Sequence, residues 1–397
     1  MTEVPFKFFD CDNHYYEPLD AFTRHIEPEF ARRAVSVATI NGRQRVLTGE
    51  KVLNFIPNPT FDPVAAPGAL DQYFRGHNPE SRSTREMFGK LEPIRPAYRN
   101  RDARLALMDE QGMAATILLP TLGVGVEQSL RHDIPAVAAA FRAFNRWMLE
   151  EWGFAHEGRI FAAPYITLSD PALAAAEVTW ALEHDTRFIV MVPGPVQTAA
   201  GLRSPADRMF DRFWSVVNEA GITTIYHTGS VYYETYFRAW AEPAEDEAFS
   251  AGPLHTLISP DGRSIHDTLA SFLTNKMFER FPRLRIAAIE LGCDWLFELV
   301  SKLAKAYGQA PKRFPEDPRE TLRRHLWVSP FYEDRLGSLR DLIGADRILM
   351  GSDFPHVEGL TEPSLYIKDL HAFDYSAEDI EKVMRSNGYD LATPLGR

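Results

Sequence analysis

Cysteine is scarce in this chain of 397 residues, which contains only Cys11 and Cys293. Two cysteines do not provide a disulfide framework, so we expect a protein of a reducing compartment, the cytoplasm. The N-terminal segment lacks the basic and then apolar stretch of a secretory signal. No apolar run approaches the roughly 18 residues that a membrane helix requires. These absences predict a cytoplasmic protein that does not cross a membrane.

Positive charge is also in deficit, because 43 Lys and Arg residues stand against 55 Asp and Glu, a formal net charge of -12. Nucleic-acid binding needs a basic face, and attraction to an anionic membrane surface needs a basic patch. We therefore expect neither nucleic acid nor membrane as a partner. A small-molecule substrate is the expected partner, since the local potential in a cleft can oppose the overall sign.

A glycine-rich phosphate loop is missing after the first strand-like segment, which disfavours the alternative of an open doubly wound sheet. The chain instead alternates short apolar segments with amphipathic helical ones. Eight segments are predicted strands, at residues 8–14, 114–120, 159–166, 188–192, 222–227, 284–290, 326–329 and 347–353. Such strands, separated by helices, predict a parallel sheet covered on both faces, and eight units close into an α/β (β/α)8 TIM barrel.

Two long insertions interrupt this alternation. Residues 35–98 begin with a hairpin signal, Asn41-Gly42 between two strand-like runs, and continue rich in Pro, Gly, Asn and Arg. Residues 231–266 are rich in Tyr, Trp and Glu. Long connections without regular structure are usually functional, so we expect both insertions to lie over the C-terminal mouth of the barrel. The whole chain, 1–397, is predicted to be one barrel domain.

Polar side chains come where the predicted strands end, which is where TIM barrels carry their active sites. Asp12 and His14 lie two residues apart on the first strand, so both point to one face. His227, Glu290 and Asp353 end or follow later apolar strands. Two imidazoles with two or three carboxylates can form the ligand set of divalent zinc, manganese or iron. The pattern therefore predicts a metal site at the mouth of the barrel.

The polar residues belong to four longer motifs. They are Asp12-Asn13-His14-Tyr15-Tyr16-Glu17-Pro18, Tyr226-His227-Thr228-Gly229, Ile289-Glu290-Leu291-Gly292-Cys293-Asp294-Trp295 and Gly351-Ser352-Asp353-Phe354-Pro355-His356. In these the chain resembles the amidohydrolase superfamily, specifically its amidohydrolase-related, aminocarboxymuconate-semialdehyde decarboxylase-like metal-dependent hydrolases. The resemblance implies that Asp12, His14, His227 and Asp353 hold one divalent metal ion, with zinc expected first and manganese or iron as alternatives. It also implies a homodimer, for which the 231–266 insertion is a candidate interface.

Two positions depart from the pattern of that family. Many members have His-x-His on the first strand, where this chain has Asp12, and the added negative charge favours a harder metal such as manganese. Members with decarboxylase or deaminase activity carry a His at the end of the sixth strand, where this chain has Glu290. Glu290 is therefore either a catalytic carboxylate, a metal ligand, or an acceptor for His227. The exchange favours hydrolysis over decarboxylation.

The favoured function is hydrolysis of a small aromatic or cyclic acid by a metal-activated water. Asp353 is expected to accept the proton of the water and return it to the leaving group. His356 either donates near the developing oxyanion or is a hydrogen-bonded loop residue. Glu17 either reaches the metal or caps the turn before Pro18. The alternatives are a non-oxidative metal-dependent decarboxylase (a lyase) and a catalytically inactive barrel that binds a ligand.

Overall fold

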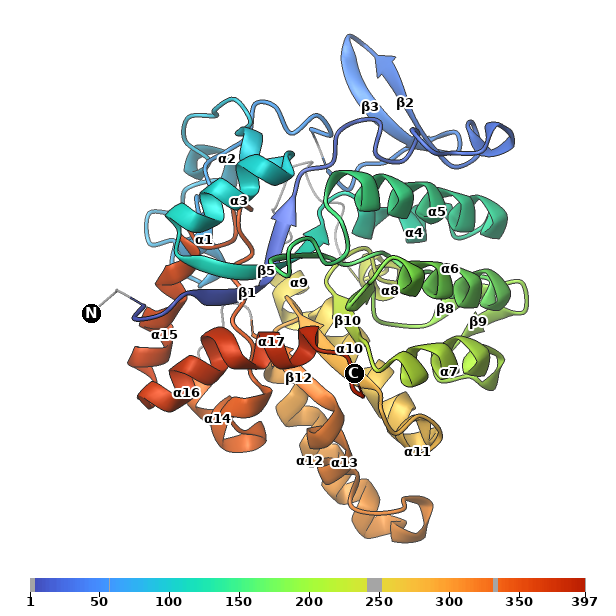
Figure 1. The fold of residues 1–397 in the computed structure, drawn as a ribbon, viewed down its shortest axis with the longest axis vertical. Helices are drawn as coiled ribbons and strands as arrows, with labels where there is room; N and C mark the ends of the chain where they lie inside the picture. Colours follow the sequence, from blue (N-terminus) through green and yellow to red (C-terminus); the bar gives the residue numbers. More distant parts are fainter. Residues whose placement is uncertain (1–3, 57, 241–251, 331–334, 397) are drawn as a thin grey trace.

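Parallel strands form the centre of the molecule in this computed structural model, which describes residues 4–56, 58–240, 252–330 and 335–396. The strands are β1 (Phe8–Tyr15), β5 (Met113–Pro120), β6 (Ile160–Ala162), β7 (Phe188–Met191), β10 (Thr223–His227), β11 (Arg285–Ile289) and β12 (Leu326–Ser329). They pair in the orders β1-β5-β6 and β7-β10-β11-β12, all in parallel (Figure 1). Their residues are nearly all buried, as expected for a sheet covered on both faces.

Single bridges join these two groups of strands into a ring. Tyr165, just beyond β6, bridges to Val190 of β7. On the other side the extended segment 348–354 lies between β12 and β1, bridging Val328 through Ile348 and Asn13 through Phe354. Seven strands and this segment therefore follow one another around the ring in the predicted order.

The predicted eighth strand, 347–353, is an irregular segment and not a regular ladder. Arg347 ends a short 3-10 turn, η6 (Ala345–Arg347), and the following residues form only isolated bridges. The segment still bonds to both neighbours, since Leu349 N–H donates to Val328 O and Cys11 N–H donates to Met350 O, both at 2.9 Å. Its regular geometry is broken at Asp353, whose φ of 53° is not that of a strand. The third strand is also shorter than predicted, since Pro164 offers no N–H to continue the β6 ladder.

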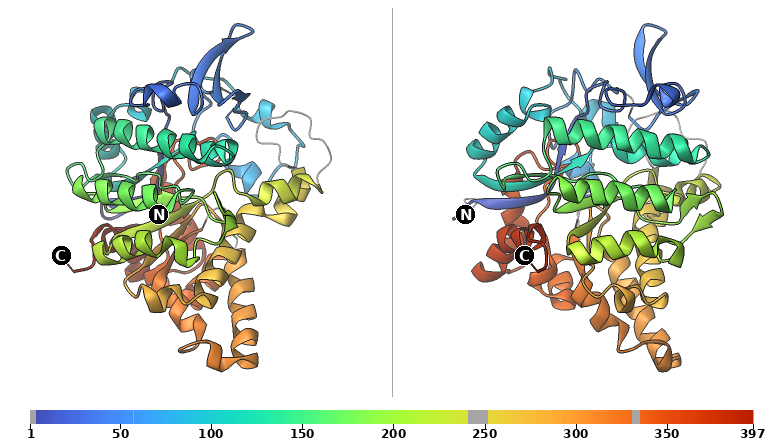
Figure 2. Two further views of the ribbon diagram at one scale, coloured as in Figure 1. Left: turned by 90° about the vertical axis from the view of Figure 1, so that its right-hand side faces the viewer. Right: turned by 45° about the vertical axis from the view of Figure 1, so that its right-hand side comes forward.

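Helices surround the ring, and α5, α6 and α7 lie side by side along one flank (Figures 1 and 2). The longer ones are α3 (Arg101–Glu110), α5 (Ile134–Glu151), α6 (Pro171–Glu183), α7 (Asp211–Ala220), α10 (Pro260–Thr274), α12 (Asp294–Gln309), α13 (Pro318–His325) and α14 (Leu336–Ile343). Shorter helices, α15 (Tyr366–Ala372), α16 (Ala377–Glu381) and α17 (Asn387–Ala392), end the chain. None of the helices in the described ranges has the length and apolarity needed to span a bilayer.

The first insertion contains the predicted hairpin. Strands β2 (Val35–Ile40) and β3 (Arg43–Thr48) pair in antiparallel around Asn41 and Gly42, both with positive φ, and project from the rest of the molecule (Figure 2). Further along, the backbone N–H of Gly68 donates to His356 O at 3.1 Å and that of Leu70 to Val357 O at 2.7 Å. The first insertion therefore contacts the loop that follows Asp353.

The range predicted as the second insertion, 231–266, is partly helical. It includes α8 (Tyr233–Arg238) and α9 (Gly252–Ile258), whereas residues 241–251 lie outside the described part of the chain. Helix α10 begins at Pro260, directly after Ser259, which takes a left-handed φ of 46°. How far either insertion covers the mouth stays a prediction.

Candidate metal centre

Five of the six predicted ligand and catalytic positions lie at the carboxyl ends of the strands. Asp12 and His14 are buried on β1, and His227 is the last residue of β10. Glu290 follows β11, and Asp353 lies near the end of the segment 348–354. Both have a positive φ, 55° for Glu290 and 53° for Asp353. Two non-glycine residues in this rarely adopted conformation, side by side at strand ends, indicate positions shaped for function rather than for folding.

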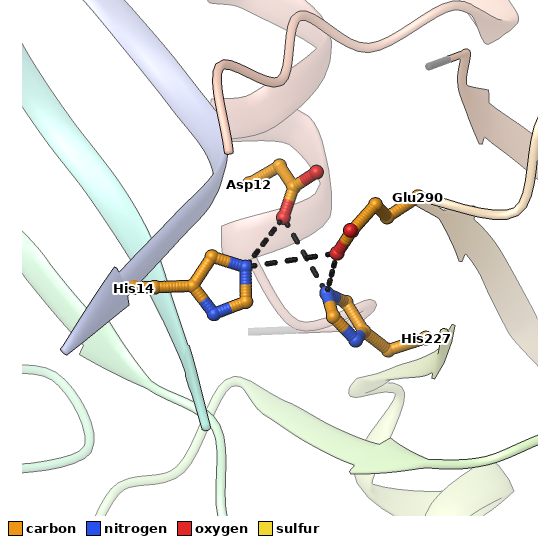
Figure 3. Close-up of side chains that lie close together, drawn as sticks. All are labelled: Asp12, His14, His227 and Glu290. Carbon is orange, nitrogen blue, oxygen red and sulfur yellow. Dashed lines mark hydrogen bonds and ion pairs between the residues drawn. The ribbon is translucent and has the colours of Figure 1, made fainter. Parts of the chain in front are cut away.

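The ligand atoms of these residues face one another across short distances. His14 Nε2 lies 3.2 Å from Asp12 Oδ1 and from Asp353 Oδ1, and 3.8 Å from Glu290 Oε2. His227 Nε2 lies 3.0 Å from Glu290 Oε2 and 3.5 Å from Asp12 Oδ1 (Figure 3). Ligands bound about 2.1 Å from one ion are separated by roughly 3 to 3.5 Å, so this spacing fits a single metal held by Asp12, His14, His227 and Glu290. Asp353 approaches His14 and Glu290 but lies outside this group of four.

The hydrogen bonds around His227 leave its inner nitrogen free for a metal. Nδ1 donates to the backbone carbonyl of Thr228 at 2.8 Å, which directs the lone pair of Nε2 into the cluster. His227 Nε2, Glu290 Oε2 and Asp353 Oδ2 are buried, yet none has a hydrogen-bond partner among the described residues. Buried polar atoms are rarely left in that condition, and a divalent cation would satisfy all three.

The pKa shifts within the cluster also indicate that a positive charge would stabilise it. Burial and the charges of Glu290 and Glu358 raise the pKa of Asp353 well above its usual range. Although burial opposes it, the contacts with Asp12 and Glu290 raise the pKa of His227 to about 10. Burial likewise opposes ionisation of Asp12, but its contacts with His14 and His227 lower its pKa to about 2. The crowded carboxylates therefore favour a bound cation at this point.

His356 is held on both ring nitrogens and cannot turn freely toward a substrate. Its Nδ1 lies 2.6 Å from Asp353 Oδ1, its Nε2 lies 2.8 Å from Thr121 Oγ1, and its ring stacks on His14 at 4.0 Å. Thr121 Oγ1 also donates to the carbonyl of Tyr15 at 2.8 Å, so it accepts from His356 Nε2. His356 Nδ1 is then the acceptor of a proton shared with Asp353. Burial, which lowers the pKa of His356 and raises that of Asp353, favours this arrangement.

Comparison with known proteins places the chain in a family. A protein-family model described as Amidohydrolase matches residues 10–391. An amidohydrolase from Mycobacterium avium subsp. paratuberculosis K-10 is 41% identical, covers 100% of both chains and superposes with a TM-score of 0.93. The chain belongs to the amidohydrolase family.

More distant solved structures share the fold of this amidohydrolase. A 2,6-dihydroxybenzoate decarboxylase from Rhizobium is 17% identical, with a TM-score of 0.58 over 81% of this chain and 94% of that one. A 5-carboxyvanillate decarboxylase from Novosphingobium aromaticivorans, solved with manganese, is 15% identical, with a TM-score of 0.55 over 99% and 97% of the two chains. At these identities the likeness extends to the fold, a TIM barrel of the amidohydrolase superfamily.

Sequence reasoning missed two further acidic residues beside the cluster. Glu358 offers a carboxylate oxygen that lies within 4.8 Å of oxygens of Glu290 and Asp353. Asp261, at the start of α10, has a buried oxygen without a hydrogen-bond partner, and burial together with Glu234 and Glu290 raises its pKa to about 7. Neither follows a predicted strand, so no strand-end pattern could indicate them.

A buried arginine that the sequence analysis did not consider supports the first strand from behind. Arg104 of α3 is 1% exposed; its Nη2 donates to the backbone carbonyl of His14 and its Nε to Ala97 O, both at 2.7 Å. It also binds the side chain of Asn13. The signal in the sequence was a charged residue one turn before Met108 on the buried face of a helix. These bonds fix the direction of the strand that carries Asp12 and His14.

Glu17 is a structural residue, which decides between its two predicted roles. Its carboxylate accepts from the backbone N–H groups of Thr121, Leu122 and Gly123 at 2.9 to 3.1 Å. It therefore fixes the loop after β5, where Thr121 holds His356. Glu17 belongs to none of the groups of side chains whose atoms could share a metal ion.

The titration of Glu17 gives a prediction for stability against pH. Burial raises its pKa from 4.5 to about 7, although the backbone N–H groups oppose the shift. A carboxyl group whose pKa is higher in the folded than in the unfolded state contributes fully to the unfolding free energy below about pH 4.5. This stabilising contribution is lost as the pH rises to about 7. Glu17→Gln should therefore reduce the fall in unfolding free energy across this range by about 2 to 3 kcal/mol.

Urea unfolding between pH 4.5 and 7.5 measures this difference, with the exposed Glu157→Gln as the matched control. The control should follow the wild-type profile. Parallel profiles for wild type and Glu17→Gln would contradict the raised pKa.

Proposed function

We propose that this amidohydrolase is a metal-dependent hydrolase of a small organic acid with an aromatic or cyclic body. The observation that carries the proposal is the convergence of Asp12, His14, His227 and Glu290, whose ligand atoms all lie within 4.8 Å of one another, with Asp353 Oδ1 beside them at 3.2 Å from His14 Nε2. Imidazole and carboxylate donors suit zinc, manganese or iron as the divalent ion. When bound, such an ion polarises the substrate and lowers the pKa of a water molecule.

Asp353 and His356 move the proton in this proposal. The pair shares one proton between Asp353 Oδ1 and His356 Nδ1, 2.6 Å apart, while Asp353 Oδ2 has no hydrogen-bond partner among the described residues. The shared proton passes to His356 Nδ1, so that Asp353 becomes a carboxylate and its Oδ2 accepts the proton of the attacking water. That proton later goes to the leaving group, and His356 returns the shared proton to Asp353 Oδ1. His356, held by Thr121, acts as a positioning residue for Asp353.

Glu290 supports hydrolysis over decarboxylation. With Asp12 and Asp353 it brings three carboxylates to the cluster, against two imidazoles. A decarboxylase would have to bring the carboxylate of its substrate into the same place, where the negative charge of the cluster repels it. Water or a neutral amide or ester group meets no such repulsion.

Decarboxylation of an aromatic acid is the second candidate function. It is favoured by the solved structures that share the fold, several of which are decarboxylases of hydroxylated benzoates, two of them with manganese bound. In that case Asp353 and His356 would deliver their shared proton to a ring carbon as carbon dioxide leaves. The same residues serve both candidates, so the fate of water distinguishes them.

Labelled water separates the two functions directly. The metal-loaded protein is incubated in 18O-enriched water with a panel of aromatic acids and their amides, esters and cyclic derivatives, and products are read by mass spectrometry. Hydrolysis predicts one 18O atom in the product and no release of carbon dioxide. Release of carbon dioxide without 18O in the product would overturn hydrolysis in favour of decarboxylation, and turnover of no panel member would contradict the proposed substrate class.

A further inference from the structure

A second hollow lies outside the metal cluster, between the two insertions and the loop after β5. Its volume is about 620 Å³, within the range of small-molecule pockets, roughly 300 to 1,000 Å³. One wall is residues 52–55 of the first insertion, and another is Gly125 with part of α4 (Val126–Leu130) and Arg131. The third wall runs from Ser230 to Arg238 and includes α8. We call it the insertion cavity.

Arg131 brings a positive charge to the insertion cavity that no described carboxylate balances. Its side chain is half-buried, and Nη1 donates only to the backbone carbonyl of Gln128, at 3.1 Å. The acidic residues nearest in the chain are engaged elsewhere. Glu127 accepts hydroxyl hydrogen bonds on the barrel side, and Asp133 pairs with Arg33 at 2.8 Å.

The charges of the described residues that line the insertion cavity leave it positive. Arg238 lies 3.2 Å from Glu234, so these two charges offset each other and Arg131 remains. A positive hollow is unusual in a protein whose formal net charge is -12. A guanidinium group binds a carboxylate through two parallel hydrogen bonds, and the side chains of Phe55 and Val231 offer apolar contact to a carbon skeleton.

A short length of chain links one wall of the insertion cavity to the metal cluster. Ser230, on its wall, lies three residues after His227, so their Cα atoms are at most about 11 Å apart. The backbone N–H of Ser230 donates to Val124 O at 3.1 Å, which ties this wall to the loop after β5. That loop also carries Thr121, the partner of His356.

From the cavity, its charge and its place we infer that the insertion cavity binds a small organic acid, with Arg131 as the residue that recognises its carboxylate. The ligand is either a second acid group of the substrate or a separate small acid beside the reaction site. Binding at Arg131 would hold a negative charge away from the three carboxylates of the metal cluster. The inference concerns binding alone and does not depend on whether the reaction is hydrolysis or decarboxylation.

Calorimetric titration of the metal-loaded protein tests this inference, with benzoate and isophthalate as probes. Arg131→Gln should weaken binding of the probe at least about tenfold, because a charge-assisted pair is lost. Arg131→Lys keeps the charge and should retain part of the affinity. Arg208→Gln, at an exposed arginine outside the cavity, is the matched control and should bind as wild type does.

A further variant, His227→Asn, distinguishes the two sources of the acid. Isophthalate binding that requires both Arg131 and His227 identifies a second acid group of the substrate, whereas benzoate binding that requires Arg131 alone identifies a separate acid. Equal affinity in wild type and Arg131→Gln, equal losses in Arg131→Gln and Arg208→Gln, or no binding of either probe would each overturn the inference.

Discussion

Replacing His227 with alanine should release the metal from this protein. His227 Nε2 faces Asp12 Oδ1 and Glu290 Oε2 at 3.5 and 3.0 Å and contributes one of the two imidazoles of the cluster. Loss of residues that only orient a metal ligand costs about 10- to 100-fold in affinity, so loss of a ligand should cost at least about a hundredfold. Metal analysis of the purified variant by mass spectrometry should find far less than one ion per chain.

The matched control for His227→Ala is His132→Ala, because His132 is exposed. The control should keep the metal content and thermal stability of the wild type. Retention of a full equivalent of metal by His227→Ala would exclude His227 from the ligand set.

Replacing Asp353 with asparagine should nearly abolish turnover while leaving the fold intact. Asparagine has the same shape and tolerates the positive φ of 53° at this position, but it cannot accept and return a proton. Loss of an acid–base group typically costs about 10²- to 10⁴-fold in kcat, and we expect a loss in that range. Because the amide oxygen can still contact a metal, metal content should fall much less than kcat.

Asp374→Asn is the control for Asp353→Asn, since Asp374 is exposed and also has a positive φ. It should leave both kcat and stability unchanged. Wild-type turnover by Asp353→Asn would show that the proton is carried by another group. Loss of metal in parallel with activity would make Asp353 a ligand without the proton role.

The order of the strands was predictable from the sequence, because apolar runs in a parallel sheet reflect burial on both faces. Strands β5, β7, β10, β11 and β12 lie where they were predicted, within one or two residues at their ends. The closing segment was not predictable as an irregular element. Its regular geometry is broken at Asp353, whose φ is 53°, and a left-handed residue fixed by tertiary contacts leaves no local pattern.

The site was predictable where it depends on strand ends and not where it depends on loops. Asp12, His14, His227, Glu290 and Asp353 end apolar runs. The structure brings the first four within 4.8 Å of one another and places Asp353 beside His14 and Glu290. Other contacts depend on how loops fold back. They are the hydrogen bonds of the two His356 nitrogens, those of the Glu17 carboxylate, and the approach of Glu358 to the cluster. For example, the backbone N–H of Leu360 donates to Ser352 O at 2.9 Å. These loop contacts require the three-dimensional structure.

The central claim is that one divalent ion joins side chains from three separate strand ends. Anomalous diffraction from crystals of the metal-loaded protein, recorded at the absorption edge of the metal, tests this claim most directly. The account predicts one peak per chain, about 2.0 to 2.3 Å from ligand atoms of Asp12, His14, His227 and Asp353. A peak elsewhere, or no peak in protein that metal analysis finds loaded, would contradict it.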